Sequence, residues 1–174
     1  SRPYQNSYSA RKEEGGVLLD LIHEIDYIGW IYGWPTELQA FMLNLNRLHI
    51  DSEEIVESIW KSENSYSVSL SLDYLSNPPT RTMHAIGSNG TIKWDGISNT
   101  VSLELNGQET KTYAYLQSRD HMFKSEIEAF LKAIKGCRDT SLSNSKDGTR
   151  SLGVCDAIRR ASQSRRSEIV SYLI

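Results

Sequence analysis

The sequence predicts an α+β fold in which an open, mostly antiparallel sheet of about six or seven strands carries helices on one face. Two patterns indicate this fold. Apolar residues recur at steps of three and four near both ends of the chain, and at steps of two across its central part. Because no helical pattern interrupts the central part, successive strands are expected to pair as antiparallel neighbours. The 174 residues are expected to form one domain of ordinary size.

Composition excludes several classes of protein. The chain is 39% hydrophobic, which argues against disorder, and its net charge of −3 argues against a generally basic nucleic-acid binder. No apolar run approaches the roughly 20 residues that span a bilayer. Two cysteines cannot form a disulfide-rich scaffold, and no secretory signal is visible. We therefore expect a cytoplasmic protein that binds neither nucleic acid nor a membrane.

The chain begins with a polar stretch, residues 1–14, that has no periodicity and is expected to form a loop. Gly15 and Gly16 separate it from a helix expected over residues 17–32. The helical spacing is carried by Leu18, Leu21, Ile22, Ile25, Ile28 and Ile31. Gly33 and Pro35 are residues that typically end a helix.

The central strands are expected at residues 36–42, 54–62, 66–74, 80–87, 90–94, 99–105 and 109–115. Turn sequences such as Asn106-Gly107 separate them. The strand at 66–74 shows the clearest alternation, with apolar side chains on one face and almost only serine on the other. That serine face has two interpretations, exposure to solvent or contact with another subunit.

Helices return after the strands. Residues 119–135 place six apolar side chains on one face, and Gly136 is a natural stop. A polar linker at 138–148 precedes a last helix at about 149–164 and a short apolar tail at 169–174.

The densest group of ionisable side chains lies in the first helix and comprises Asp20, His23, Glu24, Asp26 and Tyr27. On a helix, Asp20 and His23 are neighbours three residues apart. A histidine oriented by a carboxylate can act as a general acid or base. The alternative is a partly buried polar pair with a purely structural role. A metal site is not favoured because His23 has no second histidine four residues on.

Other reactive residue types are isolated in the sequence. The remaining histidines have no partners at a catalytic spacing, and Cys137 and Cys155 lack a flanking base. Five arginines near the C-terminus form either a solvated helix face or a site for an anion or acidic partner. No glycine-rich fingerprint for a dinucleotide follows a strand, so we assign no cofactor-binding residue.

The segment GGVLLDLIHEIDYIGWIYG, residues 15–33, resembles the substrate-domain signature of the Gfo/Idh/MocA oxidoreductases. In that signature, a glycine run is followed at short spacing by Asp, by His and by an acidic-apolar-Asp sequence. Gly15-Gly16, Asp20, His23 and Glu24 to Asp26 occupy these places. Two features depart from many members, because the glycine run is two residues long and only two residues separate Asp20 from His23.

This resemblance implies roles for individual residues. His23 matches the family's acid/base on the substrate hydroxyl, and Asp20 matches the carboxylate that positions the substrate or tunes that histidine. Tyr4, Tyr8 and Arg11 fall in the segment that resembles the substrate loop. The substrate would be a sugar, a nucleotide sugar or a cyclitol.

The resemblance also implies a larger protein around this chain. Residues 1–174 would be its C-terminal, substrate-binding domain, and the N-terminal Rossmann domain, absent from the chain, would bind NAD or NADP and supply a catalytic lysine. This chain alone would then bind no cofactor and be inactive. A homo-oligomer assembled through the open sheet face is expected. The alternative function is a non-catalytic binding or oligomerisation domain that retains the fold.

Overall fold

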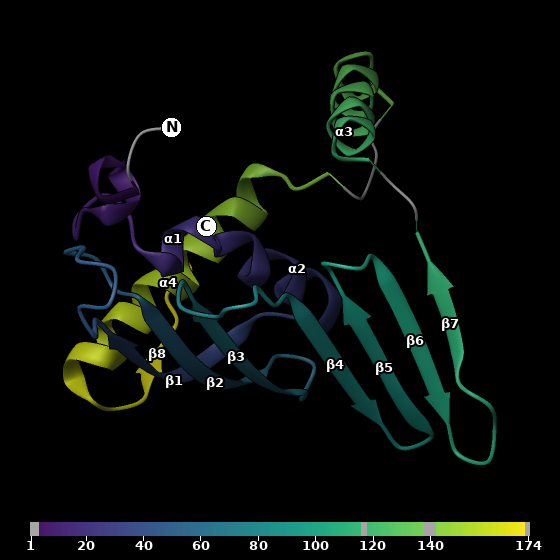
Figure 1. The fold of residues 1–174 in the computed structure, drawn as a ribbon, viewed down its shortest axis with the longest axis horizontal. Helices are drawn as coiled ribbons and strands as arrows, with labels where there is room; N and C mark the ends of the chain where they lie inside the picture. Colours follow the sequence, from purple (N-terminus) through teal and green to yellow (C-terminus); the bar gives the residue numbers. More distant parts are fainter. Residues whose placement is uncertain (1–3, 116–117, 138–141, 173–174) are drawn as a thin grey trace. The chain divides into compact units, whose positions relative to one another are not determined.

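A computed structural model describes residues 4–115, 118–137 and 142–172, and these form two compact units (Figure 1). The first unit combines Ser1–Leu75 with Ser143–Ile174, and the second is Ser76–Leu142. Within the described part, the α+β class and the antiparallel pairing are confirmed. The described strands number eight and divide into two sheets of four.

The sheet of the first unit has the strand order β3-β2-β1-β8. It is built from β1 (Pro35–Leu43), β2 (Ile55–Ser62), β3 (Ser67–Asp73) and β8 (Glu168–Ile169). Leu38 of β1 pairs with Trp60 of β2, which pairs with Val68 of β3. This register places the apolar positions of the three long strands on one face.

Helices cover that apolar face in the first unit: α1 (Val17–Asp20), α2 (Ile22–Tyr32) and α4 (Ser145–Ser164) (Figure 1). The core between helices and sheet contains Ile25, Ile28, Leu38, Val56, Trp60, Leu70, Leu72, Val154 and Ile158. On the opposite face, Ser67, Ser69 and Ser71 are exposed, as the alternation predicts.

The helix expected at residues 17–32 is not continuous. It breaks at Leu21, which has φ −106° and ψ 23° and ends α1 after four residues. The last helix, α4, begins four residues before the expected start at 149. The physical reason is a capping box, in which the side chain of Asn144 accepts from the backbone of Asp147 and the Asp147 carboxylate accepts from the backbone of Asn144.

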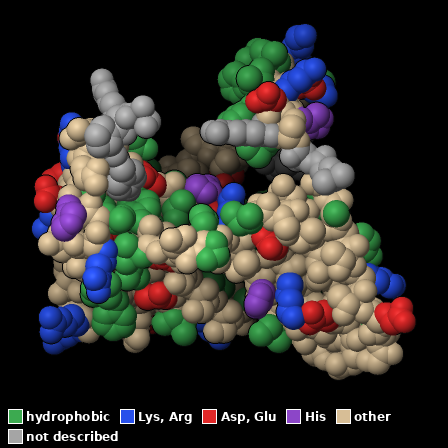
Figure 2. Space-filling view, in the orientation of Figure 1, with side chains coloured by type: hydrophobic (Ala, Val, Ile, Leu, Met, Phe, Trp, Pro, Cys, Tyr) green, Lys and Arg blue, Asp and Glu red, His purple; other side chains and the backbone are tan. Residues whose placement is uncertain are grey.

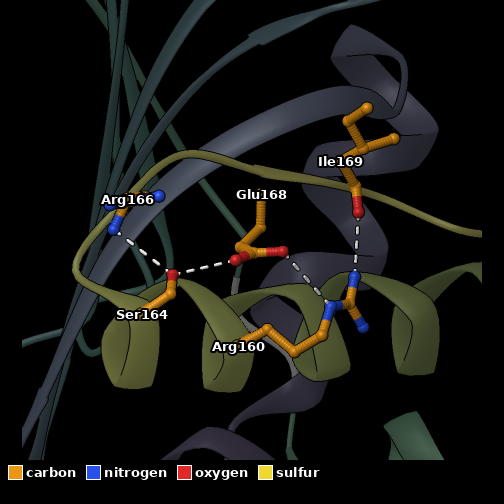
Figure 3. Close-up of polar contacts among 5 residues, drawn as sticks. All are labelled: Arg160, Ser164, Arg166, Glu168 and Ile169. Carbon is orange, nitrogen blue, oxygen red and sulfur yellow. Dashed lines mark hydrogen bonds and ion pairs between the residues drawn. The ribbon is translucent and has the colours of Figure 1, made fainter.

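The short strand β8 is held to α4 by polar contacts (Figure 3). Arg160 Nη2 donates to the carbonyl of Ile169 at 2.8 Å, and Arg160 Nε lies 3.6 Å from Glu168 Oε2. Ser164 Oγ donates to Glu168 Oε1 at 2.8 Å and accepts from the backbone N–H of Arg166. One of the five C-terminal arginines therefore has a role within the fold.

The sheet of the second unit has the order β4-β5-β6-β7, formed by Thr82–Gly87, Gly90–Asp95, Thr100–Leu105 and Lys111–Ala114. The helix α3 (Arg119–Ile134) follows it and is capped by Ser118. Hydrophobic side chains gather along α3 in Figure 2, and its apolar residues are exposed, among them Phe130 and Ile134. Within the described ranges, every helix is too short or too polar to span a bilayer.

Candidate functional site

The candidate substrate loop is fixed to the first unit through its backbone. It contains two short 3-10 turns, Tyr4–Asn6 and Tyr8–Ala10. The carbonyl of Ala10 accepts from the backbone N–H groups of Asp51 and Ser52, at 2.9 and 3.2 Å. Ser52 Oγ donates to the carbonyl of Ser9 at 2.6 Å, and both serines are buried. The loop backbone is therefore anchored, while the side chains of Tyr8 and Arg11 are exposed.

Two of the predicted substrate-binding side chains are exposed on this loop. The side chain of Tyr8 is 61% exposed. Arg11 Nη1 lies 2.7 Å from Glu14 Oε2 in a surface ion pair. The side chain of Tyr4, the third predicted residue, lies outside the described part of the chain.

Gly16, the second of the two glycines after the loop, makes room for a carboxylate. Gly16 has φ +99°, and a Cβ there would lie 2.1 Å from Glu53 Oε1. That same oxygen accepts from the backbone N–H of Leu18 at 3.1 Å, in the first turn of α1. Glu53 therefore occupies the N-terminus of α1, where the helix dipole favours a negative charge. Burial nevertheless raises the pKa of Glu53, and the nearby charge of Asp20 adds to that rise.

Asp20 ends α1 and is held by a residue far away in the sequence. Tyr74 Oη donates to Asp20 Oδ2 at 2.6 Å, joining α1 to the end of β3. The second carboxylate oxygen, Oδ1, is buried and has no hydrogen-bond partner among the described residues. A buried acceptor without a donor is uncommon in folded proteins and requires an explanation.

His23 lies in the first turn of α2 and has a different carboxylate partner. Its Nε2 lies 3.0 Å from Glu24 Oε1. The side chain of His23 is 51% exposed, whereas that of Glu24 is only 10% exposed. An exposed imidazole fixed by a buried carboxylate is an arrangement that can orient a general acid or base.

The structure thus places both predicted catalytic residues at the break between α1 and α2, each with its own partner. A continuous helix would make Asp20 and His23 three-residue neighbours, and the break at Leu21 removes that geometric basis. Tyr74 and Glu53 were missed as site residues because they contact α1 from distant segments. Glu24 could have been predicted as the partner of His23, because it is the acidic residue directly after that histidine.

The remaining candidates do not join this site. Asp26 Oδ1 accepts from Ser151 Oγ at 3.1 Å and thereby connects α2 to α4. Burial raises the pKa of the Cys155 thiol to about 12, so that thiol stays protonated. Arg150 lies over the rings of Trp34 and Tyr172. Among the described residues, no group of three or more His, Cys, Asp or Glu side chains could hold a metal ion.

The fold and this site define a class of protein: an antiparallel α+β domain whose first helices carry a histidine and carboxylates beside an anchored loop. A family model described as "GFO/IDH/MocA C-terminal domain" matches residues 1–93, which is more than half of the chain. The chain belongs to this family.

Solved structures of low sequence identity share the fold. Levoglucosan dehydrogenase in complex with NADH has a TM-score of 0.84 at 17% identity, covering 99% of this chain and 55% of the other. Aldose-aldose oxidoreductase from Caulobacter crescentus gives 0.80 at 16% identity, with 95% and 51% covered. UDP-N-acetylglucosamine 3-dehydrogenase from Acidithiobacillus ferrooxidans gives 0.73 at 22% identity, with 85% and 47% covered. The chain spans about half the length of these proteins. No curated protein sequence matches it.

Proposed function

We propose that this chain is the substrate-binding and catalytic half of an NAD- or NADP-dependent oxidoreductase. Its substrate would be a hydroxyl group of a sugar, a nucleotide sugar or a cyclitol. The observation that carries the proposal is the exposed imidazole of His23 on the buried carboxylate of Glu24, three residues after Asp20 with its unpaired buried oxygen. The family membership and the named substrates of similar structures support the substrate class.

Oxidation of a carbinol requires two departures from the substrate, a hydride from carbon and a proton from oxygen. The nicotinamide, when bound, accepts the hydride. His23 takes the hydroxyl proton. With Nε2–H donating to Glu24, the lone pair of the imidazole lies on Nδ1, and this is the atom that receives the proton. The carboxylate of Glu24 stabilises the imidazolium that forms.

Other residues of the first unit bind the substrate in this proposal. Asp20 Oδ1 accepts a hydrogen bond from a substrate hydroxyl, which satisfies its missing partner. Tyr8, Arg11 and Tyr4 line the sugar site from the loop. The described residues contain no strand, glycine-rich turn and helix in the order that binds a dinucleotide, so we assign none of them to the cofactor.

The open face of the first sheet is the surface we propose for a homo-oligomer. Phe41 of β1 and Ile59 of β2 are exposed on it, at 60% and 53%, near the serines of β3. A contiguous patch of exposed apolar side chains is typical of a protein–protein contact surface.

A screen of the full-length protein tests the proposed function. The purified protein is incubated with NAD or NADP and with glucose, levoglucosan, myo-inositol or UDP-N-acetylglucosamine, and the reduced cofactor is followed by its absorbance. We expect at least one sugar to reduce the cofactor. If none of the four is oxidised with either cofactor, the proposed activity toward this substrate class is contradicted.

A further inference from the structure

Tyr74 is anchored more firmly than a surface tyrosine. It follows β3 directly, and its backbone N–H donates to the carbonyl of Glu54 at 3.0 Å. Glu54 is itself fully buried, and its carboxylate accepts from the backbone N–H groups of Leu45 and Leu48. The ring of Tyr74 packs against the hydrophobic core of the first unit. Its hydroxyl therefore extends from a fixed support.

That hydroxyl constrains only one half of the Asp20 carboxylate. The hydrogen bond from Tyr74 Oη to Asp20 Oδ2 is 2.6 Å long, as expected for a hydroxyl donating to a charged oxygen. Because a carboxylate is planar, fixing Oδ2 also restricts where Oδ1 can lie. Oδ1 is the buried oxygen that lacks a donor among the described residues. The same contact thus holds the carboxylate, while Oδ1 stays unpaired among the described residues.

Support from the opposite side comes through α1. Glu53 holds the first turn of this helix at the N–H of Leu18, and Asp20 is the last residue of the same four-residue helix. The helix is therefore fixed at its start by Glu53 and at its end by Tyr74. A carboxylate on so short a helix would otherwise move with the fraying of its last turn.

We propose that Tyr74 is a positioning residue for substrate binding, acting through Asp20. By fixing Oδ2, it presents Oδ1 to a hydroxyl group of the substrate in one orientation. This inference rests on the proposed function, because it needs Asp20 to meet a hydroxylated substrate. Tyr74 itself does not take part in proton transfer, which belongs to His23.

The test is Tyr74→Phe in the full-length protein, assayed with the sugar of highest kcat/KM in the screen above. The variant keeps the ring and removes the hydroxyl that donates to Asp20. We expect KM to rise roughly 10-fold, as for the loss of one charge-assisted hydrogen bond, while kcat changes by less than about 2-fold. Tyr66→Phe is the matched control, because Tyr66 precedes β3 as Tyr74 follows it and is exposed. It should leave both constants unchanged.

A double-variant cycle separates positioning from a general structural role. Asp20→Asn, an isosteric change, should raise KM at least as much as Tyr74→Phe does. In the Asp20→Asn protein, adding Tyr74→Phe should change KM by less than about 2-fold, because the contact is already weakened. Circular dichroism checks that each variant is folded. If Tyr74→Phe does not fold, Asp20→Asn tests the same hydrogen bond from the side of the acceptor.

The outcomes separate this inference from the proposed function. An unchanged KM in Tyr74→Phe would overturn the role of Tyr74 while the wild-type activity stands. The same holds if the KM increases of Tyr74→Phe and Asp20→Asn multiply in the double variant. A fall in kcat alone would also overturn it. If the wild-type protein oxidises no sugar in the screen, the proposed function fails, and the role of Tyr74 fails with it.

Discussion

Gly16 shows how a single residue determines the local geometry of the site. Its φ of +99° and ψ of 162° fall in a region that is essentially restricted to glycine. A Cβ at this position would also collide with the carboxylate of Glu53, which caps α1. Both the backbone conformation and the close approach of Glu53 therefore require a glycine at position 16. This glycine directly precedes α1, the helix that carries Asp20.

We expect Gly16→Ala to lower the free energy of unfolding by about 2 kcal/mol or more, because backbone strain and a steric clash add. Gly107→Ala is the control, since Gly107 also has positive φ (+72°) but nothing lies within 4 Å of its missing Cβ. Strain alone should make that change cost about 1 kcal/mol. Urea unfolding measures both, and equal losses for the two variants would contradict the account of Gly16.

At the level of single residues, the sequence predicted Asp20 and His23 as candidates but not the side chains that contact them. Asp20 and His23 were predicted from their spacing and from the family signature, and both lie where α1 meets α2. Their contacts with Tyr74 and Glu24 were not predicted. Spacing describes neighbours only along a regular helix, and it contains no information on a tyrosine 54 residues away.

Among the elements, α1 depends on a residue outside itself. Four residues form too short a helix to be stable alone. Glu53 satisfies the N–H of Leu18, and its backbone carbonyl accepts from Val17 at 3.3 Å. The Glu53 carboxylate lies at the first turn of α1 although burial raises the pKa of this carboxyl group.

This burial predicts a pH dependence for the helix. Because the pKa of Glu53 is raised in the folded state above its ordinary value of 4.5, protonation stabilises the native chain. That stabilisation is fully present below the unfolded-state pKa and is lost as the pH rises through the folded-state pKa. Glu53→Gln cannot ionise and does not lose it. The free energy of unfolding of this variant, relative to the wild type, should therefore increase between pH 4 and neutral pH.

Denaturant unfolding at several pH values measures this difference. Glu13→Gln, a change at an exposed position of the first unit, shows how much arises from removing a surface charge. A difference between Glu53→Gln and wild type that stays constant over the whole pH range would contradict a raised pKa for Glu53.

The strands could be predicted more completely than the helix ends. All seven segments expected as strands contain a strand. In β1, β2 and β3, buried and exposed positions alternate because one face of their sheet packs against the core. The eighth strand, β8, has only two residues, too few for any periodicity. The break at Leu21 was missed because the apolar spacing continues across it. The start of α4 was missed because its first turn is polar and resembles a linker.

At the scale of the molecule, the division of the strands into two sheets was not predicted from the sequence. Pro78 and Pro79 lie between β3 and β4, and neither can donate a hydrogen bond to a neighbouring strand. Residues in both units match the family fold, since similar structures cover nearly all of this chain. The candidate site, in contrast, comes entirely from the first unit.

Removal of the substrate proton by His23 is tested by the kinetics of His23→Ala in the full-length protein. General-base catalysis contributes about 100-fold or more, so kcat should fall by at least that factor. The affinity for the nicotinamide cofactor should change by less than about 2-fold. His84→Ala, at an exposed position of β4, serves as the control and should retain wild-type kcat. A His23→Ala protein that keeps wild-type turnover would contradict the account.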